Sequence, residues 1–202
     1  MKLYYTPGAC SLSPHIILRE IGAQFELERV DAATKTTEHG EDFRQVNPKG
    51  YVPALRLPDG EVLTEGAAVV QYIADAHGAR DLAPPVGTVA RARLQEHLNF
   101  VASELHKAFS PLFHPAASAE AKAAAPENVG RRFDHVERVL GDGRPYLLGE
   151  TFTVADAYLF VVSSWAVPTG IGLDRWPLLA AFVERVRGRP TVRAAMAAEG
   201  LD

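Results

Sequence analysis

The chain has 202 residues, of which 47% are hydrophobic and 23% charged, and its formal net charge is −4 at pH 7. This length can bury a substantial core, and the composition is that of an ordinary globular protein. The mild negative charge gives no global attraction to nucleic acid or to an anionic membrane. No apolar run reaches the length of a membrane span, and no signal-peptide pattern opens the chain. We therefore expect a cytoplasmic protein that binds neither nucleic acid nor membrane.

The single cysteine, Cys10, follows a strand-like start and precedes a helix-like run that begins at Ser11. One cysteine excludes an internal disulfide, and no group of Cys and His has metal-ligand spacing, so we expect no metal. At a helix N-terminus, unpaired N–H groups and the helix dipole favour thiolate over thiol, which makes Cys10 a candidate nucleophile. A small buried hydrophobic residue is the alternative, and placement alone does not decide between them.

Strand and helix signals alternate over residues 1–80 in the order β-α-β-α-β-β-α, which predicts a small α/β domain with a mixed sheet. The predicted strands are 1–5, 25–30, 52–57 and 61–63, with an Asp-Gly turn between the last two. Three helices are predicted here. The first begins at Ser11, the second covers 41–46, and the third runs from Glu65 to about Ala76 with Thr64 as its N-cap.

Residues 81–87 have the composition of a linker, and no strand signal follows them. The predicted helices beyond it are 88–115, 119–140, 154–167, 177–188 and 191–198. Thr153 is predicted to cap the third of these, with the Asp156 side chain reaching back to the N–H of the cap residue. The second domain is therefore predicted to be all-helical over residues 88–202.

A cysteine after the first strand of such a domain suggests the thioredoxin-like fold. Ser13 stands where redox members carry a resolving cysteine, so a disulfide on Cys10 would need an external thiol for its release. Five segments together, spread over essentially the whole chain, resemble the bacterial beta class of glutathione transferases: YTPGACSLSPHI, NPKGYVPAL, LTEGAAVVQYIAD, LNFVASELHKAFSPLF and FTVADAYLF. The resemblance implies a thioredoxin-like domain over 1–80 with a mixed four-stranded sheet, glutathione as co-substrate in a cleft between the domains, and a homodimer.

The resemblance also implies which residues bind glutathione. Cys10 would lie beside the glutathione sulfur, and His106 would be its ionisable neighbour, so these two are the expected catalytic residues. The full expected set is Ala9, Cys10, Lys35, Tyr51, Val52, Pro53, Glu65, Gly66, Asn99, Ser103, His106 and Lys107.

The chemical groups of glutathione can be matched to several of these residues. A cis bond between Val52 and Pro53 would turn the backbone of Val52 outward to pair with the tripeptide, although an ordinary X-Pro turn is the simpler interpretation of those two residues alone. A helix N-terminus at Gly66 suits a carboxylate, and Glu65 can offset the γ-glutamyl ammonium or merely serve the helix dipole. Glycine at 66, where the wider superfamily usually has serine, keeps the N–H but loses a hydroxyl. Lys35 is a fainter candidate for the glycyl carboxylate.

A polar stripe follows the linker, at spacings that put its members on one helical face: Asn99, Ser103, His106 and Lys107. Leu98, Val101, Ala102, Leu105 and Phe109 would pack on the other faces. A polar stripe is more often a solvated surface, but the resemblance places this one against the cleft that faces Cys10. Tyr5 and Ser11 are auxiliary hydroxyl candidates; the alternatives are a core tyrosine and a helix cap.

Of three functions, the first is the one that we predict, and the other two are its alternatives. The first is conjugation of glutathione to hydrophobic electrophiles, with an apolar pocket near Phe109, Leu112, Phe113 and Trp165. The second is thiol–disulfide or peroxide reduction through a mixed disulfide between Cys10 and glutathione. The third is a non-enzymatic carrier of hydrophobic ligands.

Overall fold

Four short strands form one mixed sheet in the computed structural model, which describes residues 1–201. They are β1 (Lys2–Tyr5), β2 (Glu26–Arg29), β3 (Ala54–Arg56) and β4 (Val62–Thr64), in the order β2-β1-β3-β4. β1 pairs in parallel with β2 and antiparallel with β3, which pairs antiparallel with β4. The predicted mixed four-stranded sheet is confirmed.

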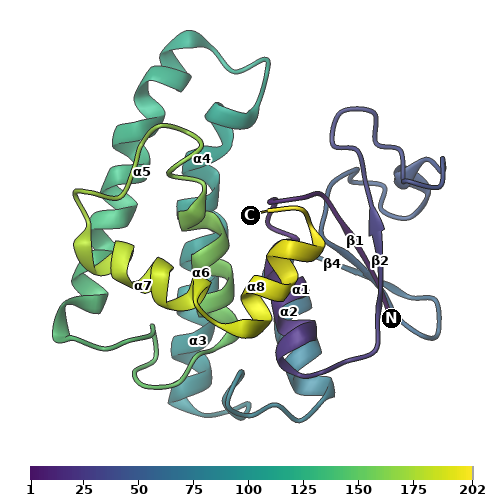
Figure 1. The fold of residues 1–202 in the computed structure, drawn as a ribbon, viewed down its shortest axis with the longest axis horizontal. Helices are drawn as coiled ribbons and strands as arrows, with labels where there is room; N and C mark the ends of the chain where they lie inside the picture. Colours follow the sequence, from purple (N-terminus) through teal and green to yellow (C-terminus); the bar gives the residue numbers. More distant parts are fainter. Residues whose placement is uncertain (202) are drawn as a thin grey trace. The chain divides into compact units, whose positions relative to one another are not determined.

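The helices of this part of the chain lie together on one side of the sheet in Figure 1. They are α1 (Leu12–Glu20), α2 (Gly66–Ala76) and α8 (Pro190–Ala198), and a short 3₁₀ turn, η1 (Phe43–Gln45), stands where residues 41–46 were predicted to be helical. Phe43 packs with Tyr4, Val30 and Ala54 in a buried cluster. Ile16 and Ile17 of α1 are also fully buried, so this unit has a core of its own.

Chain segments that are distant in sequence share this unit. It holds Met1–Ala83 together with the chain from Gly188 onward, whereas Pro84–Arg187 form a second unit. The sequence-based division had assigned residues 188–202 to the helical domain. Arg189 donates from Nε and Nη2 to the two carboxylate oxygens of Glu20 at 2.9 Å each, and α8 lies beside α1 in Figure 1. This two-point charged contact and the packing of α8 bring the end of the chain to the α/β unit.

The start of α2 differs from the prediction. Thr64 is the last residue of β4, where it pairs with Ala54, so the prediction that it caps the helix is wrong. Glu65 occupies the cap position with φ of 70°, and the helix begins at Gly66. The strand pairing holds Thr64 in the sheet and leaves one residue, Glu65, to make the whole change of direction. At the other end, Gly78 follows the helix with φ of 64°, the left-handed conformation that commonly ends a helix.

The second unit is helical throughout its regular structure. Its elements are α3 (Val89–Phe100), a π-turn η2 (Val101–Leu105), α4 (His106–Phe113), α5 (Ala119–Val139), a 3₁₀ turn η3 (Leu140–Asp142), α6 (Val154–Ser164) and α7 (Pro177–Arg187). The single helix predicted over 88–115 is therefore three consecutive pieces. Within residues 1–201, no helix is both long enough and apolar enough to cross a bilayer.

The cap of α6 joins this helix to the preceding loop. Asp156 is fully buried, and its carboxylate accepts hydrogen bonds from Thr153 N at 2.8 Å, Thr153 Oγ1 at 2.6 Å and Leu147 N at 2.8 Å. The predicted return of Asp156 to the cap residue is confirmed. Burial raises the pKa of Asp156 to about 6, although its three donors favour the charged form and act in the opposite direction.

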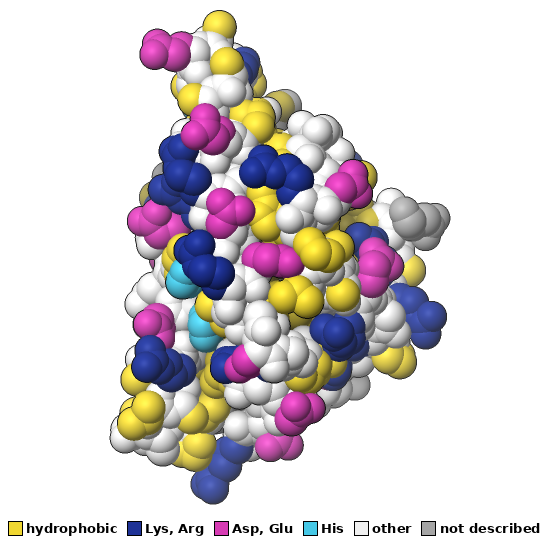
Figure 2. Space-filling model, turned by 90° about the vertical axis from the view of Figure 1, so that its left-hand side faces the viewer, with side chains coloured by type: hydrophobic (Ala, Val, Ile, Leu, Met, Phe, Trp, Pro, Cys, Tyr) yellow, Lys and Arg dark blue, Asp and Glu magenta, His cyan; other side chains and the backbone are white. Residues whose placement is uncertain are grey.

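Surface charges of both signs alternate on the face shown in Figure 2, with histidine side chains among them. Among the exposed charges of the helical unit, some pair along helices, such as Arg131 with Glu127 at 2.8 Å on α5 and Arg93 with Glu96 at 2.6 Å on α3. Exposed pairs of this kind contribute little to folding. The stability of the helical unit therefore depends on its buried contacts.

Replacing Asp156 with Asn tests the α6 cap. The amide keeps one acceptor oxygen but turns an NH₂ group toward a donor, so we expect the free energy of unfolding to fall by about 3 kcal/mol. Urea unfolding followed by circular dichroism measures it. The exposed Glu150→Gln variant is the control, with a change below about 0.5 kcal/mol; an equally small change for D156N would show that the cap is unimportant.

Candidate functional site

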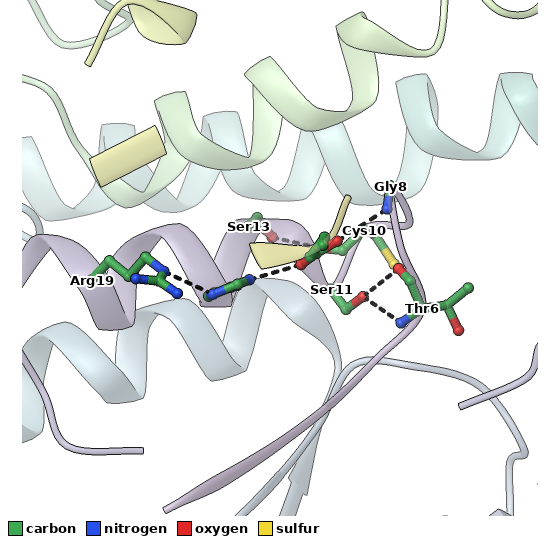
Figure 3. A network of polar contacts seen from close by, with 8 residues as sticks. Thr6, Gly8, Cys10, Ser11, Ser13 and Arg19 are labelled. Carbon is green, nitrogen blue, oxygen red and sulfur yellow. Dashed lines mark hydrogen bonds and ion pairs between the residues drawn. The ribbon is translucent and has the colours of Figure 1, made fainter. Parts of the chain in front are cut away.

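The loop before α1 is folded by two serine side chains. Ser11 Oγ accepts from Thr6 N at 3.2 Å and donates to Thr6 O at 3.3 Å. Ser13 Oγ donates to Cys10 O at 2.8 Å, and Figure 3 shows these groups around the cysteine. Ser11 is fully buried and does not cap α1 through its side chain. Its hydroxyl therefore shapes the loop that carries Cys10; Ser11 stands at the N-cap position of α1, but its side chain makes no capping hydrogen bond.

Cys10 itself is half-buried, and its thiol meets the backbone of a distant turn. The Sγ atom donates to Val52 O at 3.5 Å. The peptide bond between Val52 and Pro53 is cis, as predicted. The thiol and the Val52 corner, 42 residues apart in sequence, thus form one local site within the α/β unit.

A buried carboxylate from the end of the chain holds the same loop. Glu199 Oε2 accepts from Gly8 N at 3.0 Å, and Oε1 lies 2.8 Å from His15 Nδ1. Arg19 Nε donates to His15 Nε2 at 2.9 Å, so Nδ1 carries the imidazole proton that Glu199 accepts. Gly8 has φ of 71°, which favours glycine, and the side chain of Leu201 lies over it. Figure 3 shows this chain of contacts along α1.

Tyr5 ends β1 and is 9% exposed. Burial raises the pKa of its hydroxyl and so favours the neutral phenol. Ala9 closes the first turn of the loop, because its N–H donates to Thr6 O at 3.0 Å and its carbonyl accepts from Leu12 N at 3.0 Å. Cys10 therefore follows a residue whose backbone N–H and carbonyl are both hydrogen-bonded.

A second cluster lies at the corner between β4 and α2. Glu65 Oε1 accepts from Lys49 Nζ at 2.5 Å and from Tyr51 OH at 3.3 Å. Lys49 Nζ also donates to Thr64 Oγ1 at 2.9 Å, and Asn47 Nδ2 donates to Tyr51 O at 2.7 Å. Lys49 was not among the predicted site residues; no local pattern marks it, because its partner lies 16 positions away.

Strand register brings the two parts of this cluster together. Ala54 pairs with Thr64, so Pro53 and Glu65 flank the same end of the hairpin. Glu65 holds a left-handed conformation that non-glycine residues rarely adopt, and such positions concentrate at functional sites. Gly66 then offers the first N–H of α2. The arrangement supplies a carboxylate and a helix N-terminus side by side, which suits a ligand that carries both an ammonium and a carboxylate.

Lys35 occupies the segment between β2 and η1. It also has a positive φ, 61°, and is half-buried. Its N–H donates to Asp31 O at 2.9 Å, and its carbonyl accepts from Phe43 N at 2.8 Å. The backbone of Lys35 is therefore held by hydrogen bonds on both its N–H and its carbonyl.

The helical unit carries the remaining predicted residues, and a π-turn changes their arrangement. The N–H of His106 bonds to Val101 O, five residues back, where an α-helix would use the carbonyl four residues back. The extra residue per turn rotates the following positions, so residues seven apart no longer share a face. Asn99, Ser103 and Lys107 are exposed, whereas His106 is half-buried. No local pattern in the sequence predicted this turn.

His106 contacts two aromatic residues. Its Nδ1 lies 2.9 Å from Tyr158 OH, and its ring centroid lies 4.8 Å from that of Trp165, in an edge-on arrangement. Burial lowers the pKa of His106 to about 4, and the positive charge of Lys107 adds to that effect. The imidazole is therefore neutral at pH 7 and acts as a hydrogen-bonding group, not as a cation.

An aromatic cluster continues from His106 along α4. The ring centroid of Trp165 lies 5.7 Å from that of Phe109 and 5.2 Å from that of Phe113. Phe109 is fully buried, but Phe113 is 52% exposed. The cluster thus runs from the neutral imidazole to the surface at Phe113. The predicted pocket residue Leu112, on the same helix, is half-buried.

The eight predicted residues of the α/β unit are Ala9, Cys10, Lys35, Tyr51, Val52, Pro53, Glu65 and Gly66, and the four of the helical unit are Asn99, Ser103, His106 and Lys107. Among the residues that the structure describes, no group of three or more His, Cys, Asp and Glu side chains could hold a metal ion.

Comparison with known proteins shows what the chain is similar to. Residues 8–76 match the family model for the glutathione S-transferase N-terminal domain, and residues 100–190 match that for the C-terminal domain. Glutathione S-transferase GstA of Escherichia coli O157:H7 is 46% identical over 201 residues, covering both chains fully.

Two solved structures are similarly close. A sphingomonad glutathione S-transferase complexed with glutathione is 51% identical, with a TM-score of 0.95 and full coverage of both chains. A bacterial beta class glutathione S-transferase from Sphingomonas chungbukensis is 49% identical, with a TM-score of 0.96 and the same full coverage.

Replacing Glu199 with Ala tests its hold on the Cys10 loop. Gly8 N–H and His15 would lose a buried acceptor, so we expect the free energy of unfolding to fall by about 3 kcal/mol. In the folded variant, Cys10 should react faster with iodoacetamide because its loop is less constrained. Arg193→Ala, an exposed change on α8, is the control and should alter neither measurement. If iodoacetamide alkylated Cys10 of E199A at the wild-type rate, Glu199 would not be what holds the Cys10 loop.

The low pKa of His106 predicts a pH dependence of stability. The folded-state pKa, about 4, lies below the unfolded value near 6.5, so unfolding takes up a proton between these values. The contribution of neutral His106 is complete above pH 6.5 and is lost as the pH falls.

From pH 7 to pH 5, the unfolding free energy of the wild type should therefore fall by roughly 2 kcal/mol more than that of His106→Gln. Urea titrations at both pH values measure this difference. His114→Gln, an exposed change on the same unit, should follow the wild type; parallel behaviour of H106Q would refute the prediction.

Proposed function

The chain belongs to the glutathione S-transferase family, and from that premise we propose that it conjugates reduced glutathione to hydrophobic electrophiles, with Cys10 beside the glutathione sulfur. It is an enzyme of that family, and glutathione is its co-substrate. One observation carries the position of the sulfur: the Cys10 thiol lies 3.5 Å from Val52 O, at the cis Val52-Pro53 corner. A backbone corner of this kind can pair with a tripeptide like an added strand.

Glutathione presents two carboxylates, an ammonium, a thiol and two amides. In the proposed site, the backbone of Val52 pairs with the peptide, and Gly66 N–H at the start of α2 receives the γ-glutamyl carboxylate. Glu65 offsets the ammonium, and Lys35 takes the glycyl carboxylate. Since glycine stands at 66, the carboxylate lacks a hydroxyl donor there, and its binding depends on backbone N–H groups.

Four polar residues of the helical unit are proposed to take part in binding glutathione, on the family resemblance. His106 is neutral and can act as a hydrogen-bonding group, and the other three side chains are exposed: Asn99, Ser103 and Lys107. The charge of Lys107 favours the thiolate over the thiol. Each unit by which the site lowers the thiol pKa is worth about 1.4 kcal/mol between the two protonation states.

The reaction then needs no group beyond the thiolate. Its sulfur attacks the electrophilic carbon, the C–S bond forms, and the bond to the leaving group breaks with its electron pair. The thiol proton has already passed to solvent. Phe113 would contact the apolar body of the electrophile, because it is the exposed end of the cluster that it forms with Phe109 and Trp165. A homodimer is also proposed, on family membership alone.

Replacing Cys10 with Ala separates conjugation from reduction. In conjugation the Cys10 thiol only lies beside the glutathione sulfur. The kcat/KM toward an aryl halide should therefore fall by about 10-fold at most, which corresponds to the loss of one hydrogen bond. In reduction, the Cys10 thiolate would attack a mixed disulfide of glutathione, form a disulfide with glutathione and release the partner thiol. A second glutathione would then attack that disulfide, so that glutathione disulfide leaves and the Cys10 thiol is restored. That activity should vanish in C10A.

Cys10→Ser is the matched variant, because its hydroxyl can still donate to Val52 O but cannot form a disulfide. We expect C10S to keep more conjugation activity than C10A and to lack disulfide reduction. An absence of conjugation in the wild type at every pH tested, with disulfide reduction intact, would replace the proposed function by the reductase.

A further inference from the structure

We propose that Tyr158 is a positioning residue that fixes the tautomer of His106, so that the imidazole presents Nε2–H as a hydrogen-bond donor. The part that His106 plays in catalysis rests on the proposed function; the tautomer rests on the geometry of the helical unit alone. Nothing in the resemblance or in the comparisons assigns a role to Tyr158.

The contact lies inside the helical unit. Tyr158, on α6, is 4% exposed, and its hydroxyl lies 2.9 Å from His106 Nδ1. The two rings are perpendicular, at 90°. Trp165, which follows α6 and is 9% exposed, meets the imidazole at an interplanar angle of 74°. Both aromatic residues are thus held by the buried helix, and the imidazole has little freedom to turn.

The chemistry of the two groups sets the direction of the bond. A neutral imidazole has one N–H and one lone pair, and the bond made by one nitrogen decides the state of the other. A phenol is a stronger donor than acceptor, because its oxygen lone pair is conjugated with the ring. Tyr158 OH therefore donates to Nδ1, and the imidazole proton sits on Nε2. Burial lowers the pKa of His106 to about 4 and keeps it neutral, so that only one of its two nitrogens carries a proton.

The backbone independently directs the same residue toward α6. The N–H of His106 closes the π-turn on Val101 O, and the extra residue of that turn rotates position 106 out of the exposed stripe of Asn99, Ser103 and Lys107. Such turns often occur at functional positions. A regular α-helix would place residues 99 and 106 on one face. The π-turn and the Tyr158 hydroxyl therefore act on the same imidazole.

The tautomer decides what His106 can do. An Nε2–H group can donate to an anion such as a thiolate, but it has no lone pair there with which to remove a proton. His106 would thus stabilise a thiolate already formed and would not be the base that forms it. Without the Tyr158 hydroxyl, part of the population would carry the proton on Nδ1 and would lose that donor.

Long-range ¹H–¹⁵N correlation spectra of the full-length protein at pH 7 test the tautomer directly, with the His106 signals identified by their loss in His106→Gln. We expect a protonated Nε2 and an unprotonated Nδ1 in the wild type, and a shift toward the other tautomer in Tyr158→Phe. Tyr72→Phe, at an exposed tyrosine of α2, is the matched control and should leave the spectrum unchanged. A protonated Nδ1 in the wild type, or an unaltered spectrum in Y158F, overturns the proposal.

Kinetics test whether Tyr158 acts through His106. Loss of one hydrogen bond, about 1 kcal/mol, corresponds to a fall of about 5-fold in kcat/KM for Y158F. In the His106→Gln background the same change should cost less than about 2-fold, because its target is gone. Equal losses in both backgrounds overturn the positioning role. If H106Q alone leaves conjugation intact, the proposed function of His106 fails, and the spectra still decide the tautomer.

Discussion

The carboxylate of Glu199 is the constraint on which the arrangement of the thiol depends. It accepts hydrogen bonds from Gly8 N–H in the loop before Cys10 and from His15 on α1, and both the Glu199 and the His15 side chains are buried. A buried carboxylate without such partners would be costly, so the loop and α8 hold each other in place. The loop in turn sets Cys10 against the Val52 carbonyl. The position of the only thiol is thus decided by the end of the chain.

The two units differ in the charge of their candidate site residues. At the corner of β4 and α2, Lys49 and Glu65 are exposed charges that can be exchanged for those of a ligand at little cost, because water screens them. On the helical unit, His106 is kept neutral among Tyr158 and Trp165. The proposed recognition of a polar tripeptide and the proposed low-polarity surface for an apolar electrophile therefore lie on different parts of the chain.

Local sequence patterns predicted most of the fold. Strands and helices followed from apolar periodicity, and the α6 cap followed from the spacing of Thr153 and Asp156. The cis bond before Pro53 came from the family resemblance, since its two residues alone favoured an ordinary turn. The prediction for Thr64 failed because capping preference is a local property, whereas the pairing of Thr64 with Ala54 is a tertiary one.

Residues of the candidate site could be named from the sequence, but their geometry could not. The π-turn separates His106 from the exposed stripe with which it was grouped, and periodicity cannot show one extra residue in a turn. Lys49, Tyr158 and Glu199 were missed because their partners lie 16, 52 and 184 or more positions away. The sequence by itself determined the family, the elements and the reactive residue types, since these depend on neighbours along the chain. Only the tertiary structure decided the state of His106 and the support of Cys10, because both depend on contacts between segments far apart in sequence.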